Sequence, residues 1–373
     1  MSATMRAARM HAVGEPMRID EVPLPEPGPG DVRVAVHAVN IVPNLANILN
    51  MWTTWFPHSP LPTLPAIFGL DPAGVVESVG AGVQAFRPGD RVYVNPGRSC
   101  GSCRSCRSGD SINCASYAFA GYFGFSSTAL DLLDRYQGGL AEYMVAPAYS
   151  LVKLPDSLSF EAAARFGYIG TMYSALRKAE AGPGKTILIN GISGTLGIAA
   201  ALLAPAMGLT RVYGTGRDKA LLDQVGKLAG GRLRLHSLDD GPLDDWIREE
   251  TDGYGVDIYI DALGPGAPHE TFRAGMRAMA RGGIAVNIGA VAGDLPIDIH
   301  RMMDQQLRLM GSAWFTSAEG QTMADMAEAG LLDLSPLEHH VYPLDQVNEA
   351  IGGIAVRNGG FSNFVISPVA VAS

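Results

Sequence analysis

The sequence predicts an α/β protein of two domains, one of them built on a doubly wound parallel sheet with helices on both faces. The chain has 373 residues, which is more than one hydrophobic core usually serves. In its second half, short apolar runs that suit buried strands alternate with amphipathic stretches that suit helices. The strand-like runs are residues 187–190, 211–215, 256–261 and 283–288, and the helical stretches include 219–228 and 272–280.

The two ends of the chain differ from this middle part. Residues 1–160 are rich in Gly and Pro and contain alternating runs such as Val-Arg-Val-Ala-Val at 32–36, which are typical of half-buried strands. The last segment holds a helical stretch at 318–329 and is too short to bury a core alone. We therefore expect a first domain at 1–160, a parallel-sheet domain at 161–313, and a segment at 314–373 that returns to the first domain.

The composition excludes several classes of function. The net charge is −9 with no basic run, so nucleic-acid binding is not expected. The longest apolar run, 198–207, is far shorter than the roughly 20 residues that a membrane span needs. Residues 1–17 do not resemble a signal peptide. We expect a cytoplasmic protein that binds neither nucleic acid nor membrane.

The apolar run at 186–190 leads into a glycine-rich turn and then a helical stretch. Such a turn binds the pyrophosphate of a dinucleotide through exposed N–H groups at a helix N-terminus, and glycine permits the close approach. A glycine-rich turn without a ligand is the alternative, which the strand-to-helix context disfavours. The residues expected to bind the cofactor are Gly191, Ser193, Gly194, Thr195, Leu196 and Gly197.

The next predicted strand ends in Thr215, Gly216 and Arg217, where the adenosine ribose of a dinucleotide is expected. NAD-binding proteins place an acid at this tip, whereas NADP-binding proteins place a basic group for the 2′-phosphate. Gly216 stands at the usual acidic position and Arg217 follows it, which favours NADP(H). In the alternative interpretation Asp218 takes the acid's role, and Arg217 and Lys219 are solvated.

All four cysteines lie in one short segment, Cys100-x2-Cys103-x2-Cys106-x7-Cys114. Four thiolates complete a tetrahedral zinc site and leave no position open for substrate. We therefore expect one structural zinc per chain at residues 100–114. Disulfides are the alternative, which the lack of an export signal disfavours because cytosolic thiols stay reduced.

Further motifs accompany the glycine turn and the cysteine segment. They are Gly69-x4-Gly74-Val75-Val76-x2-Val79-Gly80, Pro88-Gly89-Asp90-Arg91-Val92, Gly138-Gly139-Leu140-Ala141-Glu142-Tyr143 and Gly282-Gly283. Over nearly its whole length the chain thus resembles the zinc-containing, alcohol-dehydrogenase-like members of the medium-chain dehydrogenase/reductase family. The resemblance implies a GroES-like β-rich catalytic domain, a Rossmann domain with a doubly wound parallel sheet, and hydride transfer with a nicotinamide dinucleotide.

The catalytic zinc ligands of that family do not carry over to this sequence. The resemblance places a cysteine, a histidine and a second cysteine at the positions that here hold Asn40, Leu70 and Gly167. Leucine and glycine side chains offer no ligand atom, so we expect no catalytic zinc. The zinc-free branch of the family, which is quinone-oxidoreductase-like and enoyl-reductase-like, also has an asparagine where Asn40 stands, but it usually lacks the four-cysteine segment.

Without zinc, either hydride goes to an already activated acceptor, or protein groups must stabilise the oxyanion that hydride transfer creates. Asn40 is expected to donate its amide to the substrate oxygen, and Tyr168, beside the third missing ligand, to donate a hydrogen bond or a proton. Asp71 is a candidate proton relay, with a buried structural acid as the alternative. His58 lies in an insertion near the cleft and is expected at the surface.

Aromatic residues gather in two stretches that are expected to border the substrate cleft. A bulky or aromatic substrate would suit such a cleft, and anchoring of loops is the alternative. The two stretches contain Trp52, Trp55, Phe56, Tyr117, Phe119, Tyr122, Phe123 and Phe125.

The leading hypothesis is an NADP(H)-dependent oxidoreductase that transfers hydride between the nicotinamide and a carbonyl, imine or carbonyl-conjugated double bond, without catalytic zinc. One alternative is an alcohol dehydrogenase or ketone reductase for a bulky secondary alcohol or ketone. The other is a non-catalytic NADPH-sensing protein. A homodimer or homotetramer is expected, joined through the last strand of the parallel sheet at 308–314.

Overall fold

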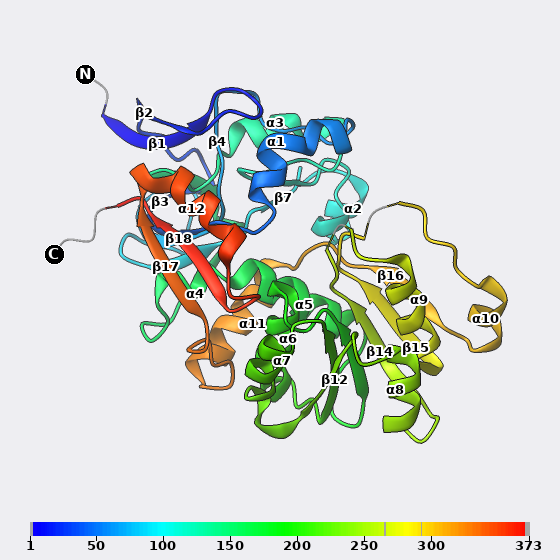
Figure 1. The fold of residues 1–373 in the computed structure, drawn as a ribbon. Coiled ribbons are helices and arrows are strands. Elements are labelled where there is room, and N and C mark those ends of the chain that lie inside the picture. Colours follow the sequence, from blue (N-terminus) through cyan, green and yellow to red (C-terminus); the bar gives the residue numbers. More distant parts are fainter. Residues whose placement is uncertain (1–2, 265, 292, 370–373) are drawn as a thin grey trace.

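The computed structural model describes residues 3–264, 266–291 and 293–369 (Figure 1). The two ends of the chain, blue to cyan and orange to red, form a β-rich part together, and the green and yellow middle forms a separate parallel sheet. The described helices include none that is both long and apolar enough to cross a bilayer.

The β-rich part contains a three-stranded sheet, in the order β2-β1-β4, and a seven-stranded sheet, in the order β10-β6-β5-β3-β18-β17 with β9 also on β3. A two-stranded pair, β7-β8, lies beside the cysteine segment. The strands are β1 (Thr4–Met10), β2 (Arg18–Pro23), β3 (Asp31–Asn40), β4 (Ala66–Ile67), β5 (Leu70–Val79), β6 (Arg91–Val94), β7 (Gly97–Arg98), β8 (Ala118–Phe119), β9 (Tyr143–Pro147), β10 (Leu151–Lys153), β17 (Glu338–Pro343) and β18 (Ser362–Ser367).

The last two strands complete the sheet of the first domain. β18 pairs antiparallel with β3, so that Val365 lies opposite Asn40, and β17 pairs parallel with β18. Strand β18 thus lies directly beside Asn40. The exact domain boundaries at 160 and 313 stay a prediction.

The middle of the chain forms six parallel strands in the order β13-β12-β11-β14-β15-β16, which confirms the predicted fold class. β11 has β12 on one side and β14 on the other, so the strand order changes direction at β11. Ligands of open parallel sheets bind at the carboxyl ends of the strands at such a point. The strands are β11 (Thr186–Asn190), β12 (Arg211–Gly216), β13 (Leu233–Ser237), β14 (Val256–Asp261), β15 (Met279–Asn287) and β16 (Arg308–Gly311).

Helices cover both faces of this sheet because its central strands are apolar on both sides. Ile187 and Ile189 of β11 belong to one core, with Ile198 of α6, whereas Leu188 between them belongs to a second core, with Phe272 of α9. The helices are α1 (Leu45–Trp55), α2 (Arg104–Arg107), α3 (Leu130–Arg135), α4 (Phe160–Ala163), α5 (Phe166–Lys178), α6 (Thr195–Ala206), α7 (Lys219–Gly226), α8 (Leu243–Glu250), α9 (His269–Arg277), α10 (Ile299–Asp304), α11 (Ser317–Glu328) and α12 (Val347–Gly353).

One expectation about an individual element is wrong, and one strand was not expected. The helix expected at 272–280 ends at Arg277, because Met279 and Ala280 already belong to β15 and the Ala278 carbonyl accepts a hydrogen bond from the Val256 N–H. Strand β13 was not expected. It is the edge strand beside β12 and carries an exposed Arg234 and a half-buried His236, so no continuous apolar run indicates it.

Candidate functional site

The glycine-rich turn lies at the carboxyl end of β11, where the strand order changes direction. Gly191 has a φ of +86°, a conformation that favours glycine, and Gly194 is the N-cap of α6. A Cβ on Gly197 would lie 2.3 Å from the Gly191 carbonyl oxygen, so only glycine lets the helix pack this closely on the turn. Thr195 and Leu196 complete the first turn of α6, whose free N–H groups suit a pyrophosphate. These residues fit a dinucleotide.

Buried polar side chains tie the three neighbouring strand ends together beneath this turn. Thr215 Oγ1 donates a hydrogen bond to Asn190 Oδ1 at 2.7 Å, and Asn190 Nδ2 donates to Asp261 Oδ1 at 3.0 Å. The N–H groups of Gly191 and Ile192 both donate to the Thr215 carbonyl. The turn is therefore fixed relative to the tip of β12.

The tip of β12 presents an exposed arginine. Gly216 lies against Ser193 Oγ, which is 3.0 Å from where a Cβ on Gly216 would be. Asp218 caps α7 by accepting the Leu221 N–H, and Lys219 pairs with Asp240 at 2.6 Å. No ion pair or hydrogen bond of the Arg217 guanidinium is found with the described residues, so this side chain is available to a ligand.

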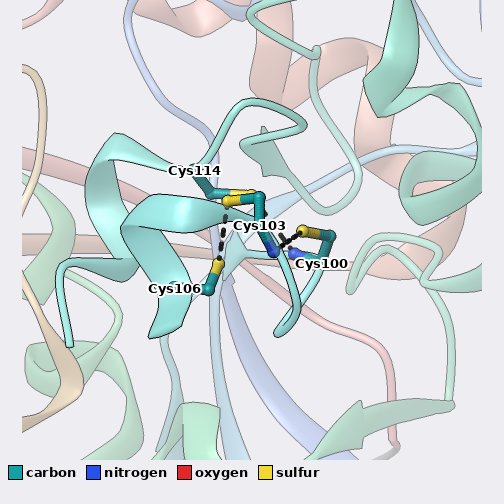
Figure 2. Close-up of side chains that lie close together, drawn as sticks. All are labelled: Cys100, Cys103, Cys106 and Cys114. Carbon is teal, nitrogen blue, oxygen red and sulfur yellow. Dashed lines mark hydrogen bonds between the residues drawn. The ribbon is translucent and has the colours of Figure 1, made fainter. Parts of the chain in front are cut away.

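The four cysteines converge on one point, as Figure 2 shows. Their Sγ atoms all lie within 4.8 Å of one another, and none is in a disulfide. Backbone N–H groups of Ser102 and Cys103 lower the pKa of the Cys100 thiol to about 6, which favours a thiolate. This donor set fits a closed, tetrahedral zinc site. In the described ranges it is the only group of three or more Cys, His, Asp or Glu side chains placed to share a metal ion.

The three positions where the resemblance places catalytic zinc ligands also lie together. Asn40, at the end of β3, is the register partner of Leu70, at the start of β5. Asp71 follows Leu70 and packs on α5, because a Cβ on Gly167 would lie 2.2 Å from Asp71 Oδ2. The Asp71 carboxyl thus fills the space that a side chain at position 167 would need. We call Asn40, Leu70, Asp71 and Gly167 the polar junction.

Asp71 is fully buried and has a φ of +58°. Its Oδ1 accepts a hydrogen bond of 2.7 Å from the Tyr93 hydroxyl, whereas its Oδ2 has no partner among the described residues. Burial raises the pKa of this carboxyl to about 7, although the Tyr93 hydroxyl, the nearby Asn40 amide and the positive charge of Arg165 favour the ionised form. The Asn40 amide lies close to the carboxyl but forms no hydrogen bond of normal geometry with it. At neutral pH the group can therefore either donate or accept a proton.

The side chains of Asn40 and Tyr168 also lie near the Asp71 carboxyl. Asn40 is 1% exposed, and neither its Oδ1 nor its Nδ2 has a hydrogen-bond partner in the part of the chain that the structure describes. Burial raises the pKa of Tyr168, which keeps its hydroxyl protonated as a donor. The Arg165 guanidinium lies over the Tyr168 ring, 5.6 Å from its centroid.

Sequence reasoning missed Tyr93 and Arg165. Arg165 is 2% exposed and donates to the carbonyls of Gly360 and Ser362. The Gly360 N–H in turn donates to the Ser193 carbonyl at 2.9 Å, so Arg165 connects the polar junction to the glycine-rich turn through the C-terminal segment. No local pattern indicates either residue, because both act through contacts made by distant strands.

The two aromatic stretches form one cluster. Trp52 stacks on Phe123 with ring centroids 4.0 Å apart, and Phe119 contacts Trp314 at 4.6 Å. Burial raises the pKa of the Tyr122 hydroxyl well above its usual value, and the nearby Tyr168 and Asp71 raise it further. The Gly69 N–H donates to the Gly121 carbonyl at 3.1 Å, so this end of the cluster lies beside Leu70 of the polar junction. The Trp55 side chain lies outside the described part, and His58 is exposed as expected.

A parallel sheet with a dinucleotide-type turn at its switch point, joined to a β-rich domain with a four-cysteine segment, defines a nicotinamide-dependent oxidoreductase. Residues 28–156 match the family model described as the alcohol dehydrogenase GroES-like domain, and residues 195–329 match the one described as zinc-binding dehydrogenase. The chain belongs to the alcohol-dehydrogenase-like medium-chain dehydrogenase/reductase family, and it is an oxidoreductase of that type.

Similar proteins cover almost the whole chain. An alcohol dehydrogenase of Geobacillus stearothermophilus is 32% identical over 342 residues, which cover 90% of this chain and 94% of that protein. An NAD-dependent alcohol dehydrogenase of Sulfurisphaera tokodaii is 28% identical over 357 residues, covering 94% and 96%. The crystal structure of AibC superimposes with a TM-score of 0.85 at 26% identity, covering 99% and 97%. The GroES-like and Rossmann-type fold class is thereby confirmed.

Proposed function

We propose that this protein transfers hydride between NADP(H) and a carbonyl, imine or carbonyl-conjugated double bond without a catalytic metal. One observation carries the proposal. Asn40 Oδ1, Asn40 Nδ2 and Asp71 Oδ2 are buried polar atoms without partners among the described residues, and they lie together at the polar junction. Since buried polar atoms are nearly always hydrogen-bonded, this arrangement favours a ligand oxygen or nitrogen that accepts from Asn40 Nδ2 and from the protonated Asp71 carboxyl.

The polar junction does not fit the zinc ion that the family name implies. Leu70 offers no ligand atom, and Gly167 has no side chain. The space at position 167 is filled by the Asp71 carboxyl, which already accepts a hydrogen bond from Tyr93. One carboxylate and one amide fall short of the three protein ligands that a catalytic zinc usually has.

A dinucleotide, when bound at the glycine-rich turn, supplies or accepts hydride at its nicotinamide. In the direction of reduction, a carbonyl carbon gains the hydride and the π electron pair moves onto the carbonyl oxygen. The Asn40 amide donates a hydrogen bond to that oxygen, and Asp71 transfers its proton to it, which leaves an alcohol and an Asp71 carboxylate. Tyr168 is the second candidate donor. Asp71 regains a proton before the next turnover.

The preference for NADP(H) over NAD(H) is part of the proposal. Arg217 is exposed at the tip of β12, and Asp218 is engaged in capping α7. A free guanidinium suits the 2′-phosphate, with which it can form charge-assisted hydrogen bonds. The relative from Sulfurisphaera tokodaii is named NAD-dependent, so this preference is argued from Arg217 alone.

The substrate is proposed to be bulky or aromatic, because the aromatic cluster around Trp52 and Phe123 reaches the polar junction through Tyr122. A second candidate is an alcohol dehydrogenase or ketone reductase that acts on a bulky secondary alcohol or ketone. The alcohol dehydrogenase names of the relatives favour it. Both candidates use the same donors and differ only in the acceptor.

The test is NADPH oxidation with a panel of aromatic ketones, enones, quinones and cyclic imines. On the best substrate, Asn40→Ala or Tyr168→Phe should lower turnover about 100–1000-fold, the usual cost of one transition-state hydrogen bond. Tyr173→Phe, a buried tyrosine on the same helix, is the matched control. Unchanged turnover in both variants would place the chemistry on other residues, and inactivity toward the whole panel, with NADPH still bound, would support a sensing protein.

A further inference from the structure

Tyr93 is a buried tyrosine whose hydroxyl makes one hydrogen bond, to Asp71 Oδ1 at 2.7 Å. Burial raises its pKa well above the usual value, with Asp71 raising it further, so the phenol stays protonated and acts as a donor. It belongs to neither the glycine-rich turn nor the cysteine segment. The proposed chemistry does not use it directly.

The position of the Tyr93 ring is fixed by the fold. In the sheet, Tyr93 pairs with Ala73 of β5 on one side and with Val152 of β10 on the other. Its ring packs between Phe166 and Phe315, with centroid distances of 5.5 and 6.4 Å. A hydroxyl held in this way fixes the carboxyl oxygen that accepts from it.

The Asp71 carboxyl is held from two directions. Tyr93 holds Oδ1, and the bare Cα of Gly167 leaves just enough room for the carboxyl on α5. With Oδ1 engaged, Oδ2 lies against α5 at Gly167, has the Asn40 amide nearby and has no hydrogen-bond partner among the described residues. The orientation of the carboxyl therefore decides which oxygen meets the ligand.

We propose that Tyr93 is a positioning residue, which holds the Asp71 carboxyl so that its free oxygen and the Asn40 amide together face the reacting oxygen or nitrogen of the substrate. The proposal rests on the proposed function, since it assigns a role to Asp71 in proton transfer. It adds a residue that touches neither substrate nor cofactor.

The groups that face Asp71 come from β3, β6, the start of α5 and the segment that holds Tyr122. Tyr93 of β6 and Asn40 of β3 stabilise its ionised form, and so does the positive charge of Arg165 beside α5. Tyr168 of α5 and the buried Tyr122 lie near enough for Asp71 to raise their pKa values, and both remain neutral. Removing the Tyr93 hydroxyl takes away one of these stabilising groups, so the pKa of Asp71 should rise further.

The first experiment needs no substrate. The infrared band of protonated carboxyl groups is followed through a pH titration of the full-length parent protein, Asp71→Asn, Tyr93→Phe and Tyr213→Phe. The parent should show a carboxyl that titrates near neutral pH, and Asp71→Asn should lack it. In Tyr93→Phe its midpoint should move upward by about 1–2 pH units, the value of one hydrogen bond to a charged group.

Tyr213→Phe is the matched control, because Tyr213 is also buried but donates to the Glu250 carbonyl in the other domain. An unchanged midpoint in Tyr93→Phe would overturn the proposal, as would an equal shift in Tyr213→Phe. If Tyr93→Phe fails to fold, Tyr93→His takes its place. Its smaller ring holds the donor group farther from Asp71, so its midpoint should lie above that of the parent. The proposal would also be overturned if Asp71 titrated in Tyr93→His as it does in the parent while hydride transfer was slower at every pH.

The second readout is the pH profile of NADPH oxidation with the best substrate of the panel. In reduction the protonated Asp71 is needed, so the alkaline loss of kcat should move to higher pH in Tyr93→Phe, with KM for NADPH near the parental value. If Asp71→Asn leaves the profile unchanged, the proposed function of Asp71 fails. If Asp71→Asn abolishes the alkaline limb but Tyr93→Phe does not move it, only the role of Tyr93 fails.

Discussion

Replacing Gly167 by alanine should drive a methyl group into the Asp71 carboxyl. The added Cβ would lie 2.2, 2.4 and 2.5 Å from Asp71 Oδ2, Oδ1 and Cγ, so the carboxyl would have to move away from Tyr93. Overpacking of a core costs about 1–3 kcal/mol, and a buried hydroxyl left without an acceptor costs about 1–3 kcal/mol more. We expect Gly167→Ala to lower the free energy of unfolding by about 2–6 kcal/mol.

The assay is chemical and thermal unfolding of Gly167→Ala beside Gly182→Ala, whose added Cβ would meet no atom within 4 Å. In an Asp71→Ala background the clash is gone, and Gly167→Ala should then be neutral or should stabilise by about 1 kcal/mol through helix propensity. The reasoning is refuted if Gly167→Ala costs no more than Gly182→Ala. It is equally refuted if Gly167→Ala costs the same with and without the Asp71 carboxyl, since the two sites would then be independent.

The remaining predictions concern the metal, the cofactor, pH and assembly. Cys106→Ser should lower the melting temperature, and a chelator should lower that of the parent before it affects hydride transfer. A melting temperature that neither change affects would argue against a structural zinc. Arg217→Ala should weaken NADPH binding about 10–100-fold and NADH binding little, and equal affinity of the parent for both cofactors would contradict this. Because folding raises the pKa of Asp71 to about 7, the folded state retains a proton that the unfolded state loses near pH 4, so this carboxyl makes the parent less stable as pH rises between the two values. Asp71→Asn should flatten that dependence of the unfolding midpoint, and an unchanged slope would show that Asp71 is ionised throughout. Light scattering at micromolar concentration should report a dimer or tetramer joined at the unpaired edge of β16, and a stable monomer would exclude it.

The parallel sheet could be predicted because its signal is local. Residues 187–189 face two different cores in alternation, so the strand is apolar at every position and its boundaries are visible in the sequence. β13 carries Arg and His at a sheet edge and lacks this signal, and the end of α9 was placed too late because the apolar run continues from the helix into β15.

In the candidate site, too, only the parts with a local sequence signal could be predicted. The cysteine segment and the glycine-rich turn are each contained in fewer than about 20 consecutive residues, and spacing alone indicates their chemistry. Tyr93 reaches Asp71 only through the register of β5 and β6, and Arg165 reaches Gly360 across most of the second half of the chain. Such contacts depend on strand pairing, which no local pattern specifies. The fit of the Asp71 carboxyl against Gly167 could not be predicted either, because it depends on the packing of β5 against α5.

The central claim is that hydride transfer here needs no catalytic zinc. The most direct measurement is the zinc content per chain of protein purified without added metal, determined on the same sample that oxidises NADPH with the best substrate of the panel. We expect about one zinc per active chain, held by the four cysteines, and almost none in the Cys103→Ser/Cys106→Ser variant. Two zinc ions per active chain, with one remaining in that variant and lost together with activity on chelation, would contradict the claim.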